Sequence, residues 1–349
     1  MKVNGWKLGV SIPAFIFLTV AAAVFLFERA ITTPMNTDVT GYRIVLKSGA
    51  TMAFVARELS QSGIIPIPQP LTWYARLKGQ AHKIQAGEYW IAPGMTPIDL
   101  VEMLVSGRVI QHPVTFIEGW TFREVLAGLA TQAQLRSMTS GMSNQQIMAA
   151  IGMKGISPEG RFFPDTYLYT AGTTDLDLLM RSASRMQQFL QNAWASRDAR
   201  LPYADIDEAL VMASVIEKET GSEGERHKIA GVFVRRLQLG MRLQSDPTVI
   251  FGMGENYKGN ISRADLKRLT AYNTYRIKGL PPTPIAMPGK ASIEAALHPA
   301  EGDELYFVGK GDGSHYFSAT LAQHRKAVEQ YQRSGRKKDY RSRPAKSVH

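Results

Sequence analysis

The chain has 349 residues, a formal net charge of +11 and no cysteine. Its length allows a sizeable core in two or more domains. The lack of cysteine excludes disulfides, thiolate metal sites and cysteine nucleophiles. Residues 332–349 hold seven basic residues and one acid, so this tail carries +6 of the total charge. Because it has almost no large apolar residues, we expect it to be disordered and either solubilising or in contact with an anionic partner.

An apolar segment near the N-terminus is long enough to cross a bilayer. It runs from Trp6 to Phe27, and about 20 apolar residues span the hydrocarbon core. Lys2 and Lys7 precede its apolar core, so the positive-inside rule predicts a cytoplasmic N-terminus. A cleaved signal peptide is the alternative. A signal peptide needs a polar cleavage region after its small residues. Here apolar residues follow the small residues 21–23, so the sequence favours an uncleaved anchor within residues 1–29.

After a short polar linker, residues 30–40, one local pattern occurs three times. Gly49, Gly94 and Gly119 each follow a strand-like piece, and two residues later a threonine can cap the helix that follows. The strand-like pieces are residues 42–46, 88–91 and 114–117. The pattern predicts small α+β modules over residues 41–132. They contain no nucleophile or metal-ligand cluster, so we expect a binding or positioning role.

Residues 133–331 alternate helical patterns with long irregular connections. Helices are expected over residues 145–151, 175–194, 207–220, 229–239, 291–297 and 321–331, and a hairpin over residues 304–317. Connections rich in proline and tyrosine, such as residues 158–167 and 271–285, suit a carbohydrate cleft, because amides and hydroxyls bind sugar hydroxyls. The expected fold class is α+β, with an N-terminal transmembrane helix, a small α+β part and a mainly helical catalytic domain over residues 133–331.

The sequence leaves carboxylate side chains as the candidates for catalysis. The chain has no P-loop, dinucleotide fingerprint, HExxH motif or GxSxG elbow, and its seven histidines are scattered. We therefore expect no metal and no other cofactor. On an ideal helix Glu217 shares an apolar face with Leu210 and Ser214, whereas Glu219 lies roughly 200° away around the axis. An apolar wall raises the pKa of a carboxyl, so Glu217 is the candidate general acid. A solvated last turn is the alternative.

An ordered set of motifs resembles that of the MltG/YceG-like endolytic murein transglycosylases. In chain order the motifs are AGEY at 86–89 before GMT at 94–96, EGWT at 118–121, EG at 159–160, FPDTY at 163–167, ASVIEKET at 213–220, LQSDPT at 243–248, YNTY at 272–275 and GLPP at 279–282. Each motif alone is weak, but the set together with the anchor is specific. It extends over residues 1–331 and leaves the tail outside.

The resemblance implies a single-pass inner-membrane protein with a LysM-like subdomain and a periplasmic catalytic domain. It implies cleavage between N-acetylmuramic acid and N-acetylglucosamine inside nascent peptidoglycan strands, which ends strand elongation. It places the catalytic glutamate on Glu217, with peptidoglycan synthases as expected partners and no nucleic acid. We expect six residues to bind the glycan and three to support the site. The six are Gln244, Asp246, Thr248, Asn273, Thr274 and Tyr275, and the three are Glu219, Glu159 and Asp165.

A lytic transglycosylase can work with one carboxylate. The acid, here Glu217, protonates the leaving oxygen and then accepts the proton of the muramoyl C6 hydroxyl as that oxygen attacks C1. The intramolecular nucleophile has a high effective concentration, so a second carboxylate is not required. Two alternatives stay open. One is a lysozyme-type hydrolase with Asp246 or Glu219 as the second carboxylate, and the other is a non-catalytic cell-wall scaffold.

Overall fold

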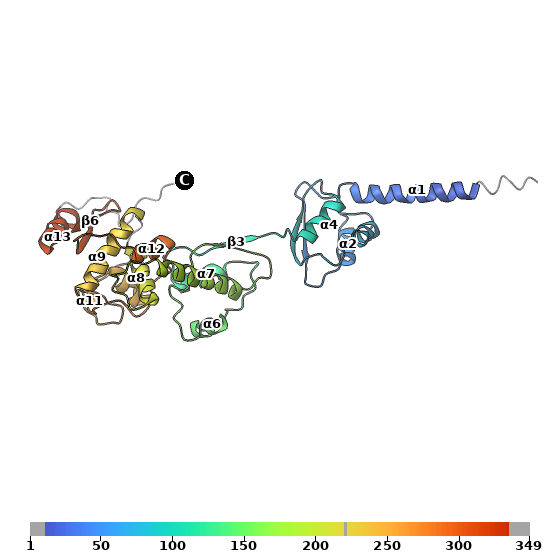
Figure 1. Cartoon of the computed structure of the whole chain (residues 1–349). Coiled ribbons are helices and arrows are strands. Elements are labelled where there is room, and N and C mark those ends of the chain that lie inside the picture. Colours follow the sequence, from blue (N-terminus) through green and yellow to red (C-terminus); the bar gives the residue numbers. More distant parts are fainter. Residues whose placement is uncertain (1–10, 220–221, 335–349) are drawn as a thin grey trace, which may run out of the picture. The chain divides into compact units, whose positions relative to one another are not determined.

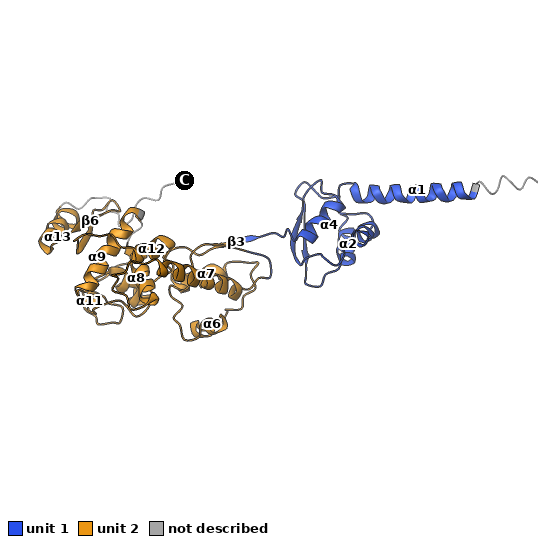
Figure 2. Cartoon of the chain, viewed as in Figure 1, with its two compact units in different colours: residues 1–112, 169–172 blue, residues 113–168, 173–349 orange. Residues whose placement is uncertain are grey.

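A computed structural model describes residues 11–219 and 222–334. The first residues of the predicted anchor, Thr220 at the end of the predicted helix and most of the basic tail lie outside these ranges. The chain divides into two compact units, residues 1–112 with 169–172 and residues 113–168 with 173–349 (Figure 2). Each unit has its own hydrophobic core. The fold mixes helices with small sheets, as the sequence predicts.

The first unit starts with a long apolar helix and continues as a small α+β module (Figure 1). Its elements are α1 (Ser11–Thr32), β1 (Tyr42–Leu46), α2 (Met52–Gln61), α3 (Gln69–Leu77), β2 (Gly87–Ile91) and α4 (Pro97–Ser106). Strands β1 and β2 pair antiparallel, with Tyr42 opposite Ile91. By length and composition α1 could cross a membrane over Ile12–Thr32. A signal sequence would pass the same test.

Threonines cap the helices of the first unit as the sequence predicts. The Oγ1 atom of Thr51 accepts a 3.2 Å hydrogen bond from Phe54 N at the start of α2. At the start of α4, Thr96 Oγ1 accepts from Asp99 N and Asp99 Oδ2 accepts from Thr96 N, a reciprocal capping box. The predicted core positions Val55 and Leu100 are fully buried. Helix α3 was not predicted, because it lies in a stretch interrupted by prolines.

The rest of the chain is mainly helical. It holds β3 (His112–Thr115), α5 (Phe122–Ala130), α6 (Asn144–Ala150), β4 (Thr166–Tyr169), α7 (Asp175–Ala195), α8 (Ile206–Glu219), α9 (Arg226–Gln238), α10 (Asp246–Met253), α11 (Arg263–Lys267), α12 (Lys290–Leu297), β5 (Tyr306–Gly309), β6 (His315–Ser318) and α13 (Leu321–Val328), with short turns at Glu223–Glu225, Gly254–Asn256 and Glu329–Arg333. Strands β3 and β4 pair. The hairpin of β5 and β6 is confirmed, with Gly309 opposite His315. Helices α10 and α11 and strand β4 lie in stretches that we expected to be irregular.

The third strand–turn–helix pattern belongs to the second unit, whereas the sequence placed a boundary after residue 132. Phe116 N donates a 2.9 Å hydrogen bond to Asp165 O. The ring of Phe122 stacks on that of Phe162 with centroids 5.1 Å apart. A repeated local pattern cannot reveal such long-range packing, and for this reason the sequence grouped α5 with the modules before it.

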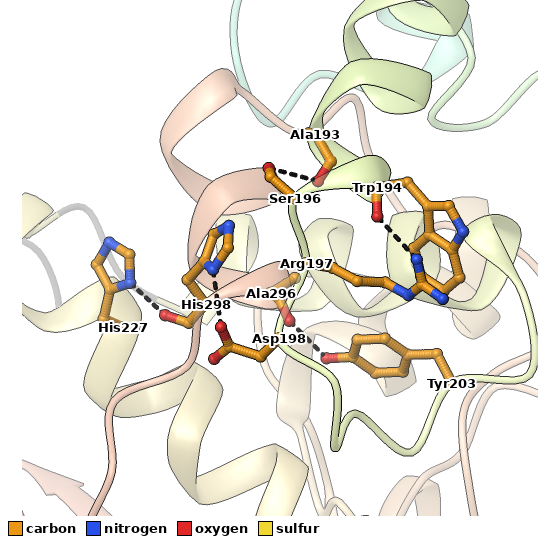
Figure 3. A network of polar contacts seen from close by, with 9 residues as sticks. All are labelled: Ala193, Trp194, Ser196, Arg197, Asp198, Tyr203, His227, Ala296 and His298. Carbon is orange, nitrogen blue, oxygen red and sulfur yellow. Dashed lines mark hydrogen bonds and ion pairs between the residues drawn. The ribbon is translucent and has the colours of Figure 1, made fainter.

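Helix α8 is the central helix of the second unit. Residues 209–216 are all buried, and the helix packs against α7, α9, α10 and α12. A polar network joins the ends of α7 and α12 near this packing (Figure 3). Within it His298 Nδ1 lies 3.0 Å from Asp198 Oδ1, and the Tyr203 hydroxyl donates a 3.0 Å bond to Ala296 O. The position of α8 is therefore fixed on several sides at once.

Leu210→Ala tests whether the two cores are independent. Leu210 is fully buried on α8, so its truncation should lower the free energy of unfolding of the second unit by about 2–5 kcal/mol. Leu59→Ala is the matched change in the core of the first unit. Hydrogen–deuterium exchange of the full chain in detergent should show faster exchange only in the unit that carries the change. Equal acceleration in both units would contradict separate cores.

Candidate functional site

A pocket of about 470 Å³ opens at the C-terminal end of α8 in the second unit. Its walls come from α8, α9, the segment that leads into α10, the β5–β6 hairpin and α13. The polar side chains that line it are Glu219, Arg236, Gln244, Asp246, Tyr275, Tyr306, His315, His324 and Gln332. The pocket therefore combines carboxylates with the amide, hydroxyl and aromatic groups that suit a sugar.

Glu219, the last residue of α8, lies in this pocket. The hydroxyl of Ser245 donates a 2.5 Å hydrogen bond to Glu219 Oε1. Burial raises the pKa of Glu219 to about 7, and the charge of Asp246 adds to this effect, while the Ser245 bond and Arg236 oppose it. A carboxyl whose pKa lies near neutral pH can both donate and accept a proton during one reaction cycle.

The segment before α10 holds Ser245 against Glu219. Ser245 N donates a 2.9 Å bond to Thr274 Oγ1, and Thr248 Oγ1 donates a 2.7 Å bond to Ser245 O. Gln244 has a φ of 55° and is the one non-glycine residue with a positive φ in the part of the chain that the structure describes. Such a conformation is disfavoured for a residue with a side chain, and it clusters at functional sites.

Asp246 and Tyr275 form a second polar pair in the pocket. The Tyr275 hydroxyl donates a 2.7 Å hydrogen bond to Asp246 Oδ1. Burial and the charge of Asp246 raise the pKa of Tyr275, so this hydroxyl keeps its proton. With Gln244, these two are the predicted binding residues that line the pocket.

The other three predicted binding residues lie behind the pocket wall. Thr248 and Thr274 are fully buried, and their hydroxyl oxygens lie 2.9 Å apart. Asn273 Oδ1 accepts a bond from Tyr275 N, and Asn273 Nδ2 donates to three backbone carbonyls, those of Asp265, Leu266 and Arg268. Their polar atoms are occupied by bonds within the protein, which suits support of the pocket. The prediction that they bind substrate stays untested.

Glu217 contacts the start of α12. Its Oε2 atom accepts hydrogen bonds from Gly289 N at 2.9 Å and from Ser292 Oγ at 2.7 Å. Its Oε1 atom lies 4.0 Å from Nη2 of Arg226. Only 7% of the side chain is exposed, and Glu217 is not among the residues that line the pocket. The geometry thus makes Glu217 a link between α8 and α12.

Glu159 and Asp165 bind other parts of the second unit. Both carboxylate oxygens of Glu159 accept from Phe122 N, at 3.2 and 3.1 Å, at the start of α5. Burial raises the pKa of Glu159 to about 7, and the nearby Glu124 adds to the shift. Asp165 Oδ2 lies 2.5 Å from Nη2 of Arg185. Neither carboxylate lines the pocket of Glu219.

The sequence analysis did not predict Arg236, Tyr306, His315 and His324 as residues of the pocket. Arg236 is buried, and its guanidinium donates to the carbonyls of Leu305 at 2.6 Å and Leu243 at 2.7 Å. His315 is held by Glu225, which accepts from both its backbone N and its Nδ1. A charged residue on the apolar face of a helix was the available signal for Arg236. For His315 the sequence offers only its neighbour Tyr316 as a signal, because the histidines are scattered along the chain.

Among the residues that the structure describes, no group of three or more histidine, aspartate or glutamate side chains is placed to hold a metal ion. The polar side chains of the pocket can transfer a proton and bind hydroxyl groups. Cleavage of a glycosidic bond requires both of these functions.

Comparisons with known proteins point to one family. A model of the YceG-like family matches residues 44–330. The chain is 31% identical over 337 residues to the endolytic murein transglycosylase of Bacillus subtilis, covering 89% of this chain and 91% of that protein. A Streptococcus pneumoniae protein of the same name is 25% identical over 359 residues, covering 92% of this chain but 64% of its own length. A solved YceG-like structure from Listeria monocytogenes matches with a TM-score of 0.53 and 26% identity, over 82% of this chain and 98% of that one.

Glu159→Gln should make the second unit more stable at alkaline pH. The folded pKa of Glu159 is about 7, above the ordinary 4.5, so the folded state holds this proton more tightly than the unfolded state. The free energy of unfolding therefore falls as pH rises from about 4.5 to 7, and it has lost the whole contribution of this proton above pH 7. Glutamine keeps an acceptor for Phe122 N and removes the charge. We expect a gain on the order of 1–2 kcal/mol at pH 8 and little change at pH 4.

Urea unfolding at the two pH values would measure this gain. Glu301→Gln, at an exposed position of the same unit, is the matched control and should show no pH-dependent gain. A Glu159→Gln protein less stable than the parent at pH 8 would contradict the assignment of a buried, costly carboxylate.

Proposed function

The chain belongs to the YceG-like family, and we propose that it is an endolytic murein transglycosylase. Its relatives in Bacillus subtilis and Streptococcus pneumoniae carry that name. The observation that carries the proposal is the pocket in which Glu219, with a pKa raised to about 7, lies with Asp246 and Tyr275. Cleavage of a glycosidic bond needs a carboxyl that is protonated at working pH and can reach the sugar.

Two carboxylates in the last turn of α8 are candidates for the general acid: Glu217, which the sequence and the family resemblance favour, and Glu219, which lines the pocket. We propose Glu219 and keep Glu217 as the alternative. Glu219 lines the pocket, and burial raises its pKa to about 7. One oxygen of Glu217 already accepts from Gly289 N and Ser292 Oγ. These bonds connect Glu217 to the start of α12, whereas Glu219 is bonded to Ser245 at the pocket.

The reaction then follows from one carboxyl group. Glu219 gives its proton to the glycosidic oxygen, the bond from C1 to that oxygen breaks, and an oxocarbenium-like sugar forms. The muramoyl C6 oxygen attacks C1, and its proton returns to Glu219. No water is consumed, and the product is a 1,6-anhydro end. Because the nucleophile belongs to the substrate, its effective concentration is high without a second catalytic carboxylate.

We assign contact with the glycan to the predicted residues that line the pocket. Tyr275 and Gln244 offer hydroxyl and amide groups for sugar hydroxyls. Asp246 places a negative charge in the pocket, which favours the positive charge that develops at C1. The same charge raises the pKa of Glu219, so Asp246 would act on both the proton and the transition state. Thr248, Asn273 and Thr274 are assigned to support of the wall.

Further proposals concern the membrane anchor, the first unit and the bond that is cleaved. We propose that α1 anchors the protein in the inner membrane with a cytoplasmic N-terminus, and that the rest faces the periplasm. The order β1, α2, α3, β2 supports a LysM-like part, in which two helices connect a pair of antiparallel strands. The bond cleaved would be that between N-acetylmuramic acid and N-acetylglucosamine inside nascent strands. Cleavage there would end elongation beside a peptidoglycan synthase.

A lysozyme-type hydrolase is the second candidate. The observation that favours it is the presence of two carboxylates, Glu219 and Asp246, in one pocket, because hydrolases use such pairs. Mass spectrometry of glycan strands digested by the protein separates the two reactions. Anhydro ends indicate transglycosylation, and reducing ends indicate hydrolysis. A cell-wall scaffold without catalysis would produce neither.

Glu219→Gln and Glu217→Gln distinguish the two candidate acids. Glutamine at 219 keeps the size and the acceptor for Ser245 but has no transferable proton. We expect it to lower the rate of anhydro-muropeptide release by about 100-fold or more, without loss of thermal stability. Glutamine at 217 should lower the melting temperature, since it weakens the bonds to α12, and should cost less than about tenfold in rate.

The reverse pattern would return the acid to Glu217. In that case Glu217→Gln would abolish release in a stable protein, while Glu219→Gln would remain active.

Asp246→Asn should shift the pH dependence of the reaction. Because Glu219 must carry its proton, kcat/KM should fall as pH rises above about 7. The charge of Asp246 raises the pKa of Glu219, so its removal should move this decline to lower pH by about half a unit to one unit. Asp303→Asn, at an exposed position of the same unit, is the control and should leave the profile in place. An unchanged profile in Asp246→Asn would argue against Glu219 as the titrating acid.

A further inference from the structure

An apolar groove lies in the first unit between α1 and α3. Four side chains of α1 line one wall, and three residues of α3 line the other. They are Val20, Ala23, Val24 and Phe27 on α1, and Trp73, Arg76 and Leu77 on α3. Nearly all of the exposed surface of this groove is apolar, and the pocket of Glu219 lies in the other unit.

Helix α3 runs beside α1 in the opposite direction. Near its start, Pro70 and Leu71 share a small cavity with Ala30, close to the C-terminal end of α1. Its last turn, with Leu77, reaches the level of Val20 to Phe27. Seven residues of helix separate Val20 from Phe27, which is about 10 Å along the axis. The end of α3 therefore lies beside the segment of α1 that would be inside a membrane.

The apolar side chains of α3 in this groove have little protein covering them. Leu77 is 78% exposed and Trp73 is 54% exposed. On α1, Val20 and Val24 are also more than half exposed. Large contiguous apolar surfaces of this kind are unfavourable in water and mark a surface that another phase or molecule covers.

The charge of this region indicates which phase that is. No acidic residue occurs from 59 to 87, whereas Arg76, Lys78 and Lys83 are basic. Tryptophan is typical of the membrane–water interface. Arginine and lysine side chains beside it can extend their charged ends to lipid phosphates while their methylene groups stay among acyl chains. Glu28 follows Phe27 on α1, so the excess of cations lies on the α3 side of the groove, and this side is complementary to anionic lipid.

We propose that α3 is an interfacial helix whose last turn inserts into the outer leaflet, with Trp73 and Leu77 among the acyl chains and Arg76 and Lys78 at the phosphates. The inference rests on the proposed membrane anchor. If the part of α1 from Val20 to Phe27 is in the bilayer, the residues of α3 that share its groove are in the bilayer too. The depth of about 10 Å agrees with that of amphipathic helices that lie in an interface.

The absence of native cysteine makes this contact measurable at single positions. Leu77→Cys and Trp90→Cys each add the sole thiol of the full chain, because the chain contains no other cysteine. Trp90 lies on β2 of the same unit, is 45% exposed and is outside the groove, so it is the matched control. Each variant carries an environment-sensitive fluorophore and is reconstituted in vesicles of phosphatidylcholine and phosphatidylglycerol that contain doxyl-labelled lipid.

We expect the lipid-borne quencher to reduce the fluorescence at position 77 at least about twofold more than at position 90. Flotation of the vesicles reports the anchor separately. Flotation with equal quenching at the two positions overturns the α3 contact and leaves the anchor intact. Loss of flotation overturns the anchor and the contact together, while the enzymatic proposal, which is measured on glycan strands, is unaffected.

Discussion

The pocket depends on the hydrogen bond that Ser245 donates to Glu219 at the end of α8. Burial alone would raise the pKa of this carboxyl further, and the Ser245 bond and the charge of Arg236 oppose burial. Hydrogen bonds with Thr274 and Thr248 position Ser245 itself. The residue before it, Gln244, has a disfavoured backbone conformation with a positive φ. The buried threonines therefore contribute to the acidity of a group that they do not touch.

Much of the fold could be predicted from short-range signals. Caps such as Thr51 and Thr121 depend on atoms within one turn of the helix that they begin, so the local sequence contains the information. The structure differs from the prediction where one local sequence pattern is compatible with two conformations. Asp246-Pro247 reads as a turn, yet proline is also favourable in the first turn of a helix, and α10 begins there. Strand β4 depends on pairing with β3, which is distant in sequence.

The fold brings together several motifs of the sequence. Glu219, Gln244, Asp246 and Tyr275, which come from three of these motifs, line one pocket. The choice between Glu217 and Glu219 assumed that α8 has one buried face, but residues 209–216 of α8 are all buried. Helical periodicity then gives no preference. The wall that contains Tyr306, His315 and His324 comes from β5, β6 and α13, and only tertiary packing brings it to α8.

The two carboxylates at the end of α8 also restrict how this segment can evolve. Each belongs to a different side of one rigid helix, with Glu217 bonded to α12 and Glu219 bonded to Ser245. Insertion or deletion of a single residue between Ala209 and Glu217 would rotate both by about 100° and misplace both together. Apolar substitutions of similar volume along the buried part of α8 keep this register, whereas gaps in an alignment of related proteins should be excluded there.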